Sequence, residues 1–195
     1  MVVLDEFLVA QEWSDLIQYA LGRGASFEKS GVLDAGGASH LDEGYRRSHV
    51  LYQLGACESM FVERITAFLP HVLARLRLPP FPISHFETQL TATNDGQFFR
   101  KHKDNDSDSV RSRVLTFVYY FFKEPKSFSG GALRLYDAQL DRHGKVTAGP
   151  YQTIHPVQNQ IVFFPSECLH EVLAVECESR DFSDSRFTVN GWVHQ

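Results

Sequence analysis

Two histidines and one aspartate are the residues of this sequence whose types and spacing could bind a metal ion. His102 and Asp104 are two positions apart, so on an extended strand both side chains point to the same face. His170 lies much later in the chain and could add a second imidazole to the same site. Two neutral imidazoles and one carboxylate on one side of a divalent metal would leave its opposite coordination positions open.

An open site of this composition is typical of non-haem Fe(II) enzymes rather than of closed structural zinc sites. The His-x-Asp motif alone predicts little, because a histidine beside an aspartate is more often a hydrogen-bonded surface pair. The run that starts at Asp104 begins like a calcium loop, but its sixth position is Ser109 and its twelfth is Leu115. An EF-hand requires glycine and glutamate there, so we exclude it.

The composition is that of a globular chain long enough to bury its own core. The 195 residues include 16 phenylalanines and 7 tyrosines, and an aromatic content of 13% favours a sheet-rich interior. We find no internal repeat and no linker, and we predict a single domain over residues 1–195. The formal net charge of −5 gives no electrostatic reason to expect a nucleic acid as partner.

Cysteine usage and hydropathy indicate a soluble, cytoplasmic protein that binds no membrane. The three cysteines (Cys57, Cys168 and Cys177) are an odd number without a C-x-x-C pair, which argues against a disulfide framework and a zinc ribbon. The N-terminal residues have no basic segment followed by an apolar run, so we expect no signal peptide. No stretch approaches the roughly 18 apolar residues of a membrane span.

The N-terminal part of the chain, residues 1–82, has mainly helical patterns. Apolar residues recur at helical spacing from Gln11 to Leu21, and glycines then end that helix. The strongest helical pattern runs from Ser59 to Leu78, where we expect Pro70 to kink or split the helix. The other expected elements are strands at Val2 to Leu4 and Tyr45 to Leu54, and a loop or hairpin at residues 25–44.

From residue 83 onward the sequence changes to strand patterns separated by turns. Asn94-Asp95-Gly96 is a turn signal between two strands. Val110 to Phe122 contains a run that is apolar on both faces, which predicts a central strand. Further strands are expected at Phe86 to Ala92, Ala132 to Tyr136, Ile161 to Phe164 and Phe187 to Val193, with a loop or hairpin tip at Asp141 to Pro150. Helices followed by about seven strands predict a β-sandwich or barrel with helices on one side.

The order of these features is more specific than any one of them. A His-x-Asp motif follows the glycine turn, and then come an apolar strand with a Tyr-Tyr pair, a Gly-Gly strand and a distal histidine. The chain ends in Arg186-Phe187-Thr188-Val189-Asn190-Gly191-Trp192 and three further residues. In this order the sequence resembles the prolyl 4-hydroxylase-like branch of the Fe(II)/2-oxoglutarate-dependent dioxygenases. The resemblance covers essentially the whole chain and is strongest from Thr91 to Gln195.

The resemblance implies an α+β, mainly β fold. Residues 83–195 would form a double-stranded β-helix (jelly roll), and residues 1–82 a helical support region on one side. The cofactors implied are Fe(II), with 2-oxoglutarate and O2 as co-substrates and ascorbate as a further candidate. The iron ligands would be His102, Asp104 and His170. Arg186, counted with them as catalytic, would pair with the distal carboxylate of 2-oxoglutarate, a role that suits the guanidinium fork.

Three further residues near this site follow from the same resemblance. Tyr120 resembles the tyrosine that donates a hydrogen bond to the distal carboxylate, and Thr188 is a second candidate donor. Trp192 matches a tryptophan found near the site in relatives. On a strand Tyr120 shares its face with Val118, so its hydroxyl would enter a largely apolar pocket.

The sequence departs from the family's pattern in two places. Many relatives have a tyrosine on the strand before the His-x-Asp motif, whereas Leu90 to Asn94 contain none, so the substrate pocket would be more open or use another donor. The segment between His170 and Arg186 is also longer than in compact relatives. We expect its extra residues, Cys177 to Ser185, to form a mobile hairpin tip that leaves the ligands unchanged.

The function implied by the resemblance is oxidative: 2-oxoglutarate is decarboxylated to succinate while an unactivated C–H bond is hydroxylated. Our first expectation for the substrate is a prolyl residue in a protein or peptide, with a free amino acid or small metabolite as the alternative. A nucleic-acid demethylase is disfavoured, because those enzymes carry a second arginine six residues after the first, where this chain has Trp192.

Two functions of other classes are also considered. A non-catalytic jelly-roll module that binds a metal or a sugar would not need Arg186 and Tyr120 in one pocket. A zinc hydrolase with the same three ligands would need a general base, and Glu171 would face away from its neighbour His170 on a strand. Residues 25–44 and 103–112 are expected to be loops that grip the substrate. The sequence does not indicate an oligomeric state.

Overall fold

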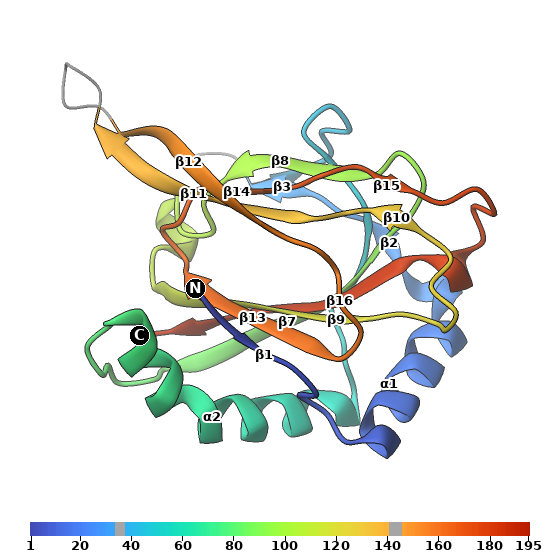
Figure 1. Cartoon of the computed structure of the whole chain (residues 1–195), viewed down its shortest axis with the longest axis horizontal. Helices are drawn as coiled ribbons and strands as arrows, with labels where there is room; N and C mark the ends of the chain where they lie inside the picture. The colour runs from blue at the N-terminus through green and yellow to red at the C-terminus, as the bar shows by residue number, and fades with distance from the viewer. Residues whose placement is uncertain (34–37, 141–145) are drawn as a thin grey trace.

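The computed structural model describes residues 1–33, 38–140 and 146–195. Two antiparallel sheets face each other as a jelly roll, and helices α1 (Ala10–Gly22) and α2 (Ala56–Leu76) cover the outer face of the larger sheet (Figure 1). This architecture confirms the predicted mainly β fold with N-terminal helices on one side. None of the helices in the described residues is long and apolar enough to span a membrane.

The larger sheet has β9 near its centre, with strands paired on both sides, as its continuous apolar run predicted. Neighbouring strands in this sheet pair antiparallel. In spatial order its described strands are β1 (Val2–Leu4), β13 (Gln160–Pro165), β9 (Arg113–Phe121), β16 (Arg186–His194), β7 (His85–Thr93), β6 (His49–Leu51) and β2 (Glu28–Lys29).

The smaller sheet carries the two histidines. Its described strands are, in spatial order, β12 (Val146–Ile154), β11 (Leu133–Leu140), β14 (His170–Val172), β8 (Phe98–His102) and β5 (Arg46–Arg47). Two further strand pairs are β3 (Val32–Leu33) with β4 (Ser39–His40), and β10 (Ser129–Gly130) with β15 (Val175–Glu176). Short 3-10 helices lie at η1 (Gly24–Ser26), η2 (Asp108–Val110) and η3 (Phe182–Asp184).

The alternation of side chains along β9 divides the interior into two clusters. Phe117 and Tyr119 face the helices, where they join the apolar residues of α1, α2 and β16. Val118 and Tyr120 face the space between the two sheets. Strand β9 is therefore buried on both faces, as its apolar side chains require. Its inner face, which points to the other sheet, lines the interior where the site lies.

Helix α2 runs without interruption through Pro70, so the prediction that this residue splits the helix is wrong. A proline inside a helix costs about 3 kcal/mol, because it removes a hydrogen bond and crowds the preceding turn. The same helix buries an apolar face that includes Phe61, Ile65 and Leu69. Each such side chain contributes about 1.5–3 kcal/mol when it is buried, so packing outweighs the defect.

Three other expectations are corrected by the fold. Tyr45 to Leu54 is not one strand, because the chain crosses between sheets at Ser48 and forms β5 and β6. Residue 82 is not a boundary between a helical region and the β core, since β1, β2, β5 and β6 belong to the two sheets. The expected end of the loop or hairpin tip at Asp141 to Pro150 is wrong, because β12 starts at Val146 and pairs antiparallel with β11, as in a hairpin; residues 141–145 lie outside the described part.

The residues from Cys177 to Ser185 are not a free hairpin tip. Asn94 donates hydrogen bonds to the carbonyl of Asp181 (2.8 Å) and to the hydroxyl of Ser185 (2.8 Å). Phe182 packs edge-on against Phe27 and Phe187, with ring centroids 5.1 and 5.2 Å apart. The segment therefore docks against the end of the larger sheet.

The contact between β16 and β9 leaves no room for a side chain at Gly191. A Cβ atom there would lie 2.2 Å from the Phe117 ring and 2.4 Å from the carbonyl oxygen of Glu87. We expect Gly191→Ala to lower the free energy of unfolding by about 1–3 kcal/mol in a urea titration, because the rigid neighbours must move. Gly22→Ala is the matched control, since a Cβ at Gly22 would meet no atom within 4 Å. Equal stability of the two variants would contradict this packing argument.

Candidate metal and co-substrate site

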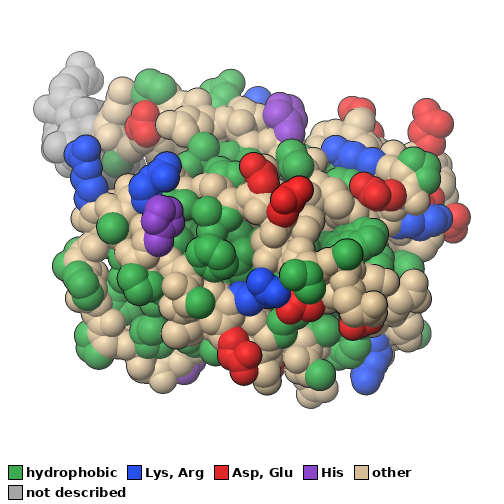
Figure 2. All heavy atoms as spheres, turned by 60° about the horizontal axis from the view of Figure 1, so that its bottom comes forward, with side chains coloured by type: hydrophobic (Ala, Val, Ile, Leu, Met, Phe, Trp, Pro, Cys, Tyr) green, Lys and Arg blue, Asp and Glu red, His purple; other side chains and the backbone are tan. Residues whose placement is uncertain are grey.

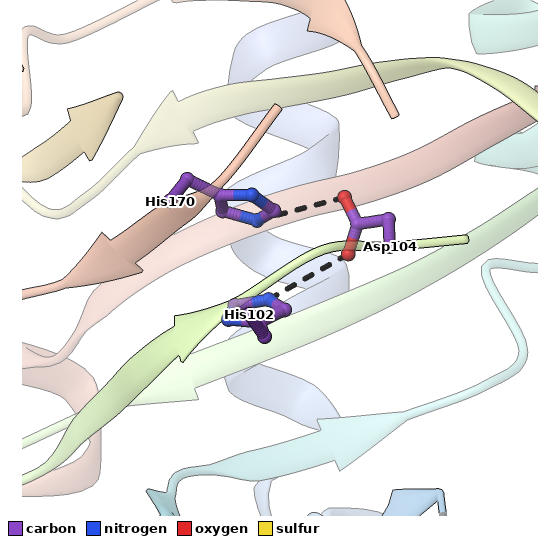
Figure 3. A group of neighbouring side chains, drawn as sticks. All are labelled: His102, Asp104 and His170. Carbon is purple, nitrogen blue, oxygen red and sulfur yellow. Dashed lines mark ion pairs between the residues drawn. The ribbon is translucent and has the colours of Figure 1, made fainter. Parts of the chain in front are cut away.

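The structure brings His102, Asp104 and His170 together at one end of the smaller sheet (Figure 3). His102 ends β8 and His170 begins β14, and the two residues are paired across these strands. The Nε2 atom of His102 lies 3.6 Å from Oδ1 of Asp104, and that of His170 lies 3.5 Å from Oδ2. One donor atom from each residue can be chosen so that all lie within 4.8 Å of one another. One metal ion could contact all three.

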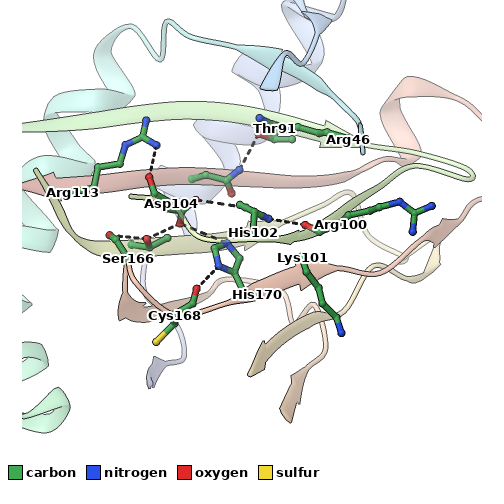
Figure 4. Close-up of polar contacts among 12 residues, drawn as sticks. Arg46, Thr91, Arg100, Lys101, His102, Asp104, Arg113, Ser166, Cys168 and His170 are labelled. Atoms are coloured by element: carbon green, nitrogen blue, oxygen red, sulfur yellow. Dashed lines mark hydrogen bonds and ion pairs between the residues drawn. The ribbon is translucent and has the colours of Figure 1, made fainter. Parts of the chain in front are cut away.

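Backbone carbonyls orient both imidazoles. The carbonyl oxygen of Arg100 lies 2.7 Å from Nδ1 of His102, and that of Cys168 lies 2.9 Å from Nδ1 of His170 (Figure 4). A carbonyl can only accept a hydrogen bond, so in the neutral rings Nδ1 carries the proton and Nε2 presents its lone pair. Both lone pairs are then available to a metal, as in many histidine metal sites.

Asp104 is held by Thr116 on β9 and by Ser166, which directly follows β13. The Thr116 hydroxyl donates to Oδ2 of Asp104 (2.7 Å) and lies 3.0 Å from the hydroxyl of Ser166. The Asp104 amide donates to the carbonyl of Ser166 (3.0 Å). These contacts fix both the backbone and the carboxylate, although Asp104 itself lies just beyond the end of β8.

The electrostatics of the group favour metal binding. Burial, together with the nearby His170, lowers the pKa of His102 to about 3, so this ring is neutral at physiological pH. Burial acts to raise the pKa of Asp104, but the two imidazoles and the Thr116 hydroxyl outweigh it and hold this pKa below its usual value. The result is a neutral imidazole at His102 beside an ionised carboxylate, the protonation states that a divalent cation requires.

A second group of polar side chains lies in the same interior, between the sheets. Arg186 is 2% exposed, and Tyr120 and Thr188 are fully buried. The guanidinium carbon of Arg186 lies 5.0 Å from the centre of the Tyr120 ring, near its hydroxyl but outside hydrogen-bond geometry. The Tyr120 hydroxyl, the Thr188 hydroxyl and Nε of Arg186 have no hydrogen-bond partner among the described residues.

Gly131 makes room for this arginine. Its φ is +64°, and a Cβ there would lie 2.6 Å from Cδ of Arg186 and 2.8 Å from the Val175 side chain. Burial lowers the pKa of Arg186, yet no carboxylate forms an ion pair with it in the described part of the chain. A buried cation without a partner is unfavourable, so these groups fit a bound anion that accepts several hydrogen bonds.

Polar side chains also line the other part of the pocket. Gln89, Thr91 and Asn190 lie on its wall, and Asn190 donates to the Thr91 hydroxyl (2.9 Å). On the stretch Leu90 to Asn94, Thr91 and Thr93 line the pocket where many relatives have a tyrosine, and Tyr120 lies fully buried behind the lining residues. The polar groups expected to replace the relatives' tyrosine are therefore amides and hydroxyls.

Trp192 occupies a position that sequence reasoning left undefined. Its ring lies against the guanidinium of Arg113 at 3.8 Å, and Arg113 in turn holds Glu87 through two nitrogen atoms and donates to the Asp104 carbonyl (3.0 Å). The indole N–H faces the Asp104 carboxylate and helps to lower its pKa, but it lies outside hydrogen-bond geometry and has no other partner among the described residues.

Sequence reasoning missed the residues that support the site across strands. Thr116 and Ser166 lie in or next to apolar runs, and only the pairing of β9 with β13 brings them beside Asp104. Glu171 accepts a hydrogen bond from the Tyr136 hydroxyl and forms an ion pair with Arg134, which agrees with the expectation that it faces away from His170. Several residues of 25–44 and 103–112 line an outer groove next to the triad, which fits the prediction of substrate-gripping loops.

The Thr116 hydroxyl gives a direct test of how the carboxylate is held. We expect Thr116→Val to weaken metal binding by about 10- to 100-fold, because Asp104 loses the hydrogen bond that orients it. The measurement is an equilibrium titration of the metal-free protein with Fe(II) or Zn(II). Thr88→Val is the matched control: Thr88 is also buried, but its hydroxyl donates to Glu58. Equal loss of affinity in both variants would contradict the assigned role of Thr116.

Comparisons with known proteins agree with this geometry. Residues 88–194 match the sequence profile of the 2OG-Fe(II) oxygenase superfamily. The chain is 42% identical over 194 residues to an uncharacterised PKHD-type hydroxylase of Synechocystis sp., a match that covers 98% of this chain and 62% of that protein. The chain thus spans less than two thirds of the length of that relative.

Solved structures share the fold. A Pseudomonas putida prolyl-4-hydroxylase has a TM-score of 0.70 at 21% identity, over 100% of this chain and 92% of that one. A Trichoplax adhaerens prolyl hydroxylase, solved with a hypoxia-inducible-factor peptide, has a TM-score of 0.69 at 19% identity, over 99% of this chain and 82% of that one. With the profile match, these findings establish that the chain belongs to the 2OG-Fe(II) oxygenase superfamily, whose members use Fe(II), 2-oxoglutarate and O2.

Proposed function

We propose that this chain is an Fe(II)- and 2-oxoglutarate-dependent hydroxylase that acts on a prolyl residue in a protein or peptide. The observation that carries the proposal is the presence of two incomplete polar groups in one pocket. A His-Asp-His group with free Nε2 lone pairs lies near a buried arginine that has no carboxylate partner among the described residues. A metal ion completes the first group and a dicarboxylate completes the second.

In this proposal His102, Asp104 and His170 hold the iron. The carbonyls of Arg100 and Cys168 keep both rings in the tautomer that binds the metal, and Thr116 keeps the carboxylate turned toward it. Bound iron with 2-oxoglutarate supplies the oxidising power that places one atom of O2 in a C–H bond while the co-substrate becomes succinate.

Arg186 holds the distal carboxylate of 2-oxoglutarate, and Tyr120 and Thr188 donate to the same group. This assignment is supported by their burial and by their unpaired donors. Val118 and Leu133 form apolar walls of the pocket and exclude water. In a dry environment a charge-assisted hydrogen bond is stronger than in water, so the three donors can fix the co-substrate in one orientation.

Three observations favour a prolyl residue of a peptide as substrate. The amide side chains of Gln89 and Asn190 line the pocket and could pair with peptide groups. Phe99 and Trp192 add aromatic surface that suits an apolar ring such as that of proline. The similar fold of two prolyl hydroxylases supports the same substrate class. A free amino acid or small metabolite could be hydroxylated by the same iron chemistry, and the test below distinguishes a free amino acid from a peptide.

The assay measures succinate release and the mass of the product for a panel of proline-containing peptides and for free L-proline. We expect wild type to hydroxylate a peptide, and Asp104→Ala to form succinate only at background rate, because the metal loses its one anionic ligand. Asp108→Ala is the matched control, since Asp108 is exposed and forms an ion pair with the exposed Arg111. Full turnover by Asp104→Ala would refute the proposed ligand set. If only free L-proline were hydroxylated, the proposed substrate would be a free amino acid instead of a peptide.

A further inference from the structure

Arg46 is a charged residue of the pocket that the proposed reaction does not use. It lies on β5, a strand of the smaller sheet paired with β8, which ends at His102. Arg46 lines the pocket that contains the triad, and it also lines the outer groove beside His102 and Asp104. Arg186 lines only the first of these. Arg46 therefore lies on the side of the metal ligands where a substrate would enter.

Stacking holds the guanidinium of Arg46 at a defined place. Its central carbon lies 4.7 Å from the centre of the Phe99 ring, and the Phe99 ring stacks on the His102 imidazole with centroids 3.5 Å apart. The charge is thus separated from a proposed iron ligand by a single aromatic ring. In Figure 4 Arg46 lies on one side of the triad, and Ser166 and Cys168 lie on the other.

The hydrogen bonds of Arg46 use only part of its donor capacity. Nε donates to the Ser48 hydroxyl (3.2 Å) and Nη1 to the carbonyl of Gly31 (3.3 Å). The other terminal nitrogen has no hydrogen-bond partner within the described residues. A guanidinium has five N–H donors, so one edge of the fork is available to a ligand.

Arg46 also lacks a counter-charge of its own. Among the described residues no carboxylate forms an ion pair with it, and the carboxylate that acts on it most strongly is Asp104. That carboxylate is committed to the metal in the proposed enzyme. Arg113, the neighbouring cation of the groove, is already neutralised by Glu87. Although burial lowers the pKa of Arg46 to about 10, the group stays charged at neutral pH.

We propose that Arg46 binds a carboxylate of the substrate, so that the enzyme selects substrates with an anionic group close to the carbon that is hydroxylated. This inference rests on the proposed hydroxylase function and narrows its substrate class. The carboxylate completes the guanidinium fork with two parallel hydrogen bonds and supplies the missing counter-charge. It can come from an acidic side chain beside the target residue or from a free α-carboxylate.

The test is calorimetric binding to the whole chain, loaded anaerobically with Fe(II) and 2-oxoglutarate so that no turnover occurs. The first probes are the end-capped tripeptides Ala-Pro-Asp and Asp-Pro-Ala, each compared with its asparagine counterpart. The second set of probes consists of the same peptides with glycine in place of proline. The third set consists of N-acetylproline and its amide, which differ only in the free α-carboxylate. Each series is measured on wild type, Arg46→Gln, Arg46→Lys and the exposed control Arg23→Gln.

We expect wild type to bind the carboxylate form of at least one pair about tenfold more tightly than its neutral partner. Arg46→Gln should remove this preference and Arg23→Gln should keep it. Arg46→Lys, which keeps the charge but not the fork, should retain only part of it. Thermal unfolding checks that each variant is folded. If Arg46→Gln is not folded, the binding preference of Arg46→Lys decides the test. A preference in the tripeptides assigns the carboxylate to a side chain, and one in N-acetylproline assigns it to the α-carboxylate.

The failure of this inference differs from the failure of the prolyl proposal. No carboxylate preference in wild type, or a preference that survives in Arg46→Gln, overturns the role of Arg46 even if proline peptides bind well. A carboxylate preference that is equal in the proline and glycine series, and that depends on Arg46, supports its role while it counts against proline as the target.

Discussion

The site depends on the pairing of β14 with β8. This pairing sets His170 opposite His102 and brings the two imidazole centres to 4.1 Å. A shift of one residue in the register of β14 would turn His170 to the other face of the sheet, because side chains alternate along a strand. On the facing sheet, the Thr116 hydroxyl of β9 holds the Asp104 carboxylate, and the carbonyl of Ser166, just after β13, accepts a hydrogen bond from the Asp104 amide. The arrangement of His102, Asp104 and His170 thus depends on both sheets, which enclose one interior.

The same interior contains polar groups that folding leaves incomplete. Buried donors normally find acceptors, and in the proposed enzyme the co-substrate would complete the groups of Arg186, Tyr120 and Thr188 that have no hydrogen-bond partner among the described residues. Arg46 has the same kind of incompleteness at the entrance side, with its charge held against Phe99 and no carboxylate bound to it in the described part of the chain. Burial of these charged and polar groups is unfavourable in the free protein, because they lose water without gaining a partner. A bound carboxylate would supply that partner.

Features encoded by local patterns could be predicted from the sequence, such as the central strand β9. His102 and Asp104 lie close together, but Asp104 lies in the turn after β8 and does not share a strand face with His102. The docking of Cys177 to Ser185 could not be predicted, because its contacts with Asn94 and Phe27 join segments far apart in the chain. The supporting role of Thr116 was missed for the same reason. Of the kink or split predicted at Pro70, the split is wrong, because a local rule was applied where the packing of the whole helix decides.

The most direct test of this account is an anaerobic titration of the metal-free protein with Fe(II) and then with 2-oxoglutarate, followed by visible absorption. The account predicts the weak charge-transfer band of a 2-oxo acid chelated to Fe(II). At the same concentrations this band should be lost in Arg186→Ala and kept in Arg23→Ala, whose arginine is exposed. If wild type binds iron without developing the band, or does not bind iron, the site is not that of a 2-oxoglutarate-dependent oxygenase.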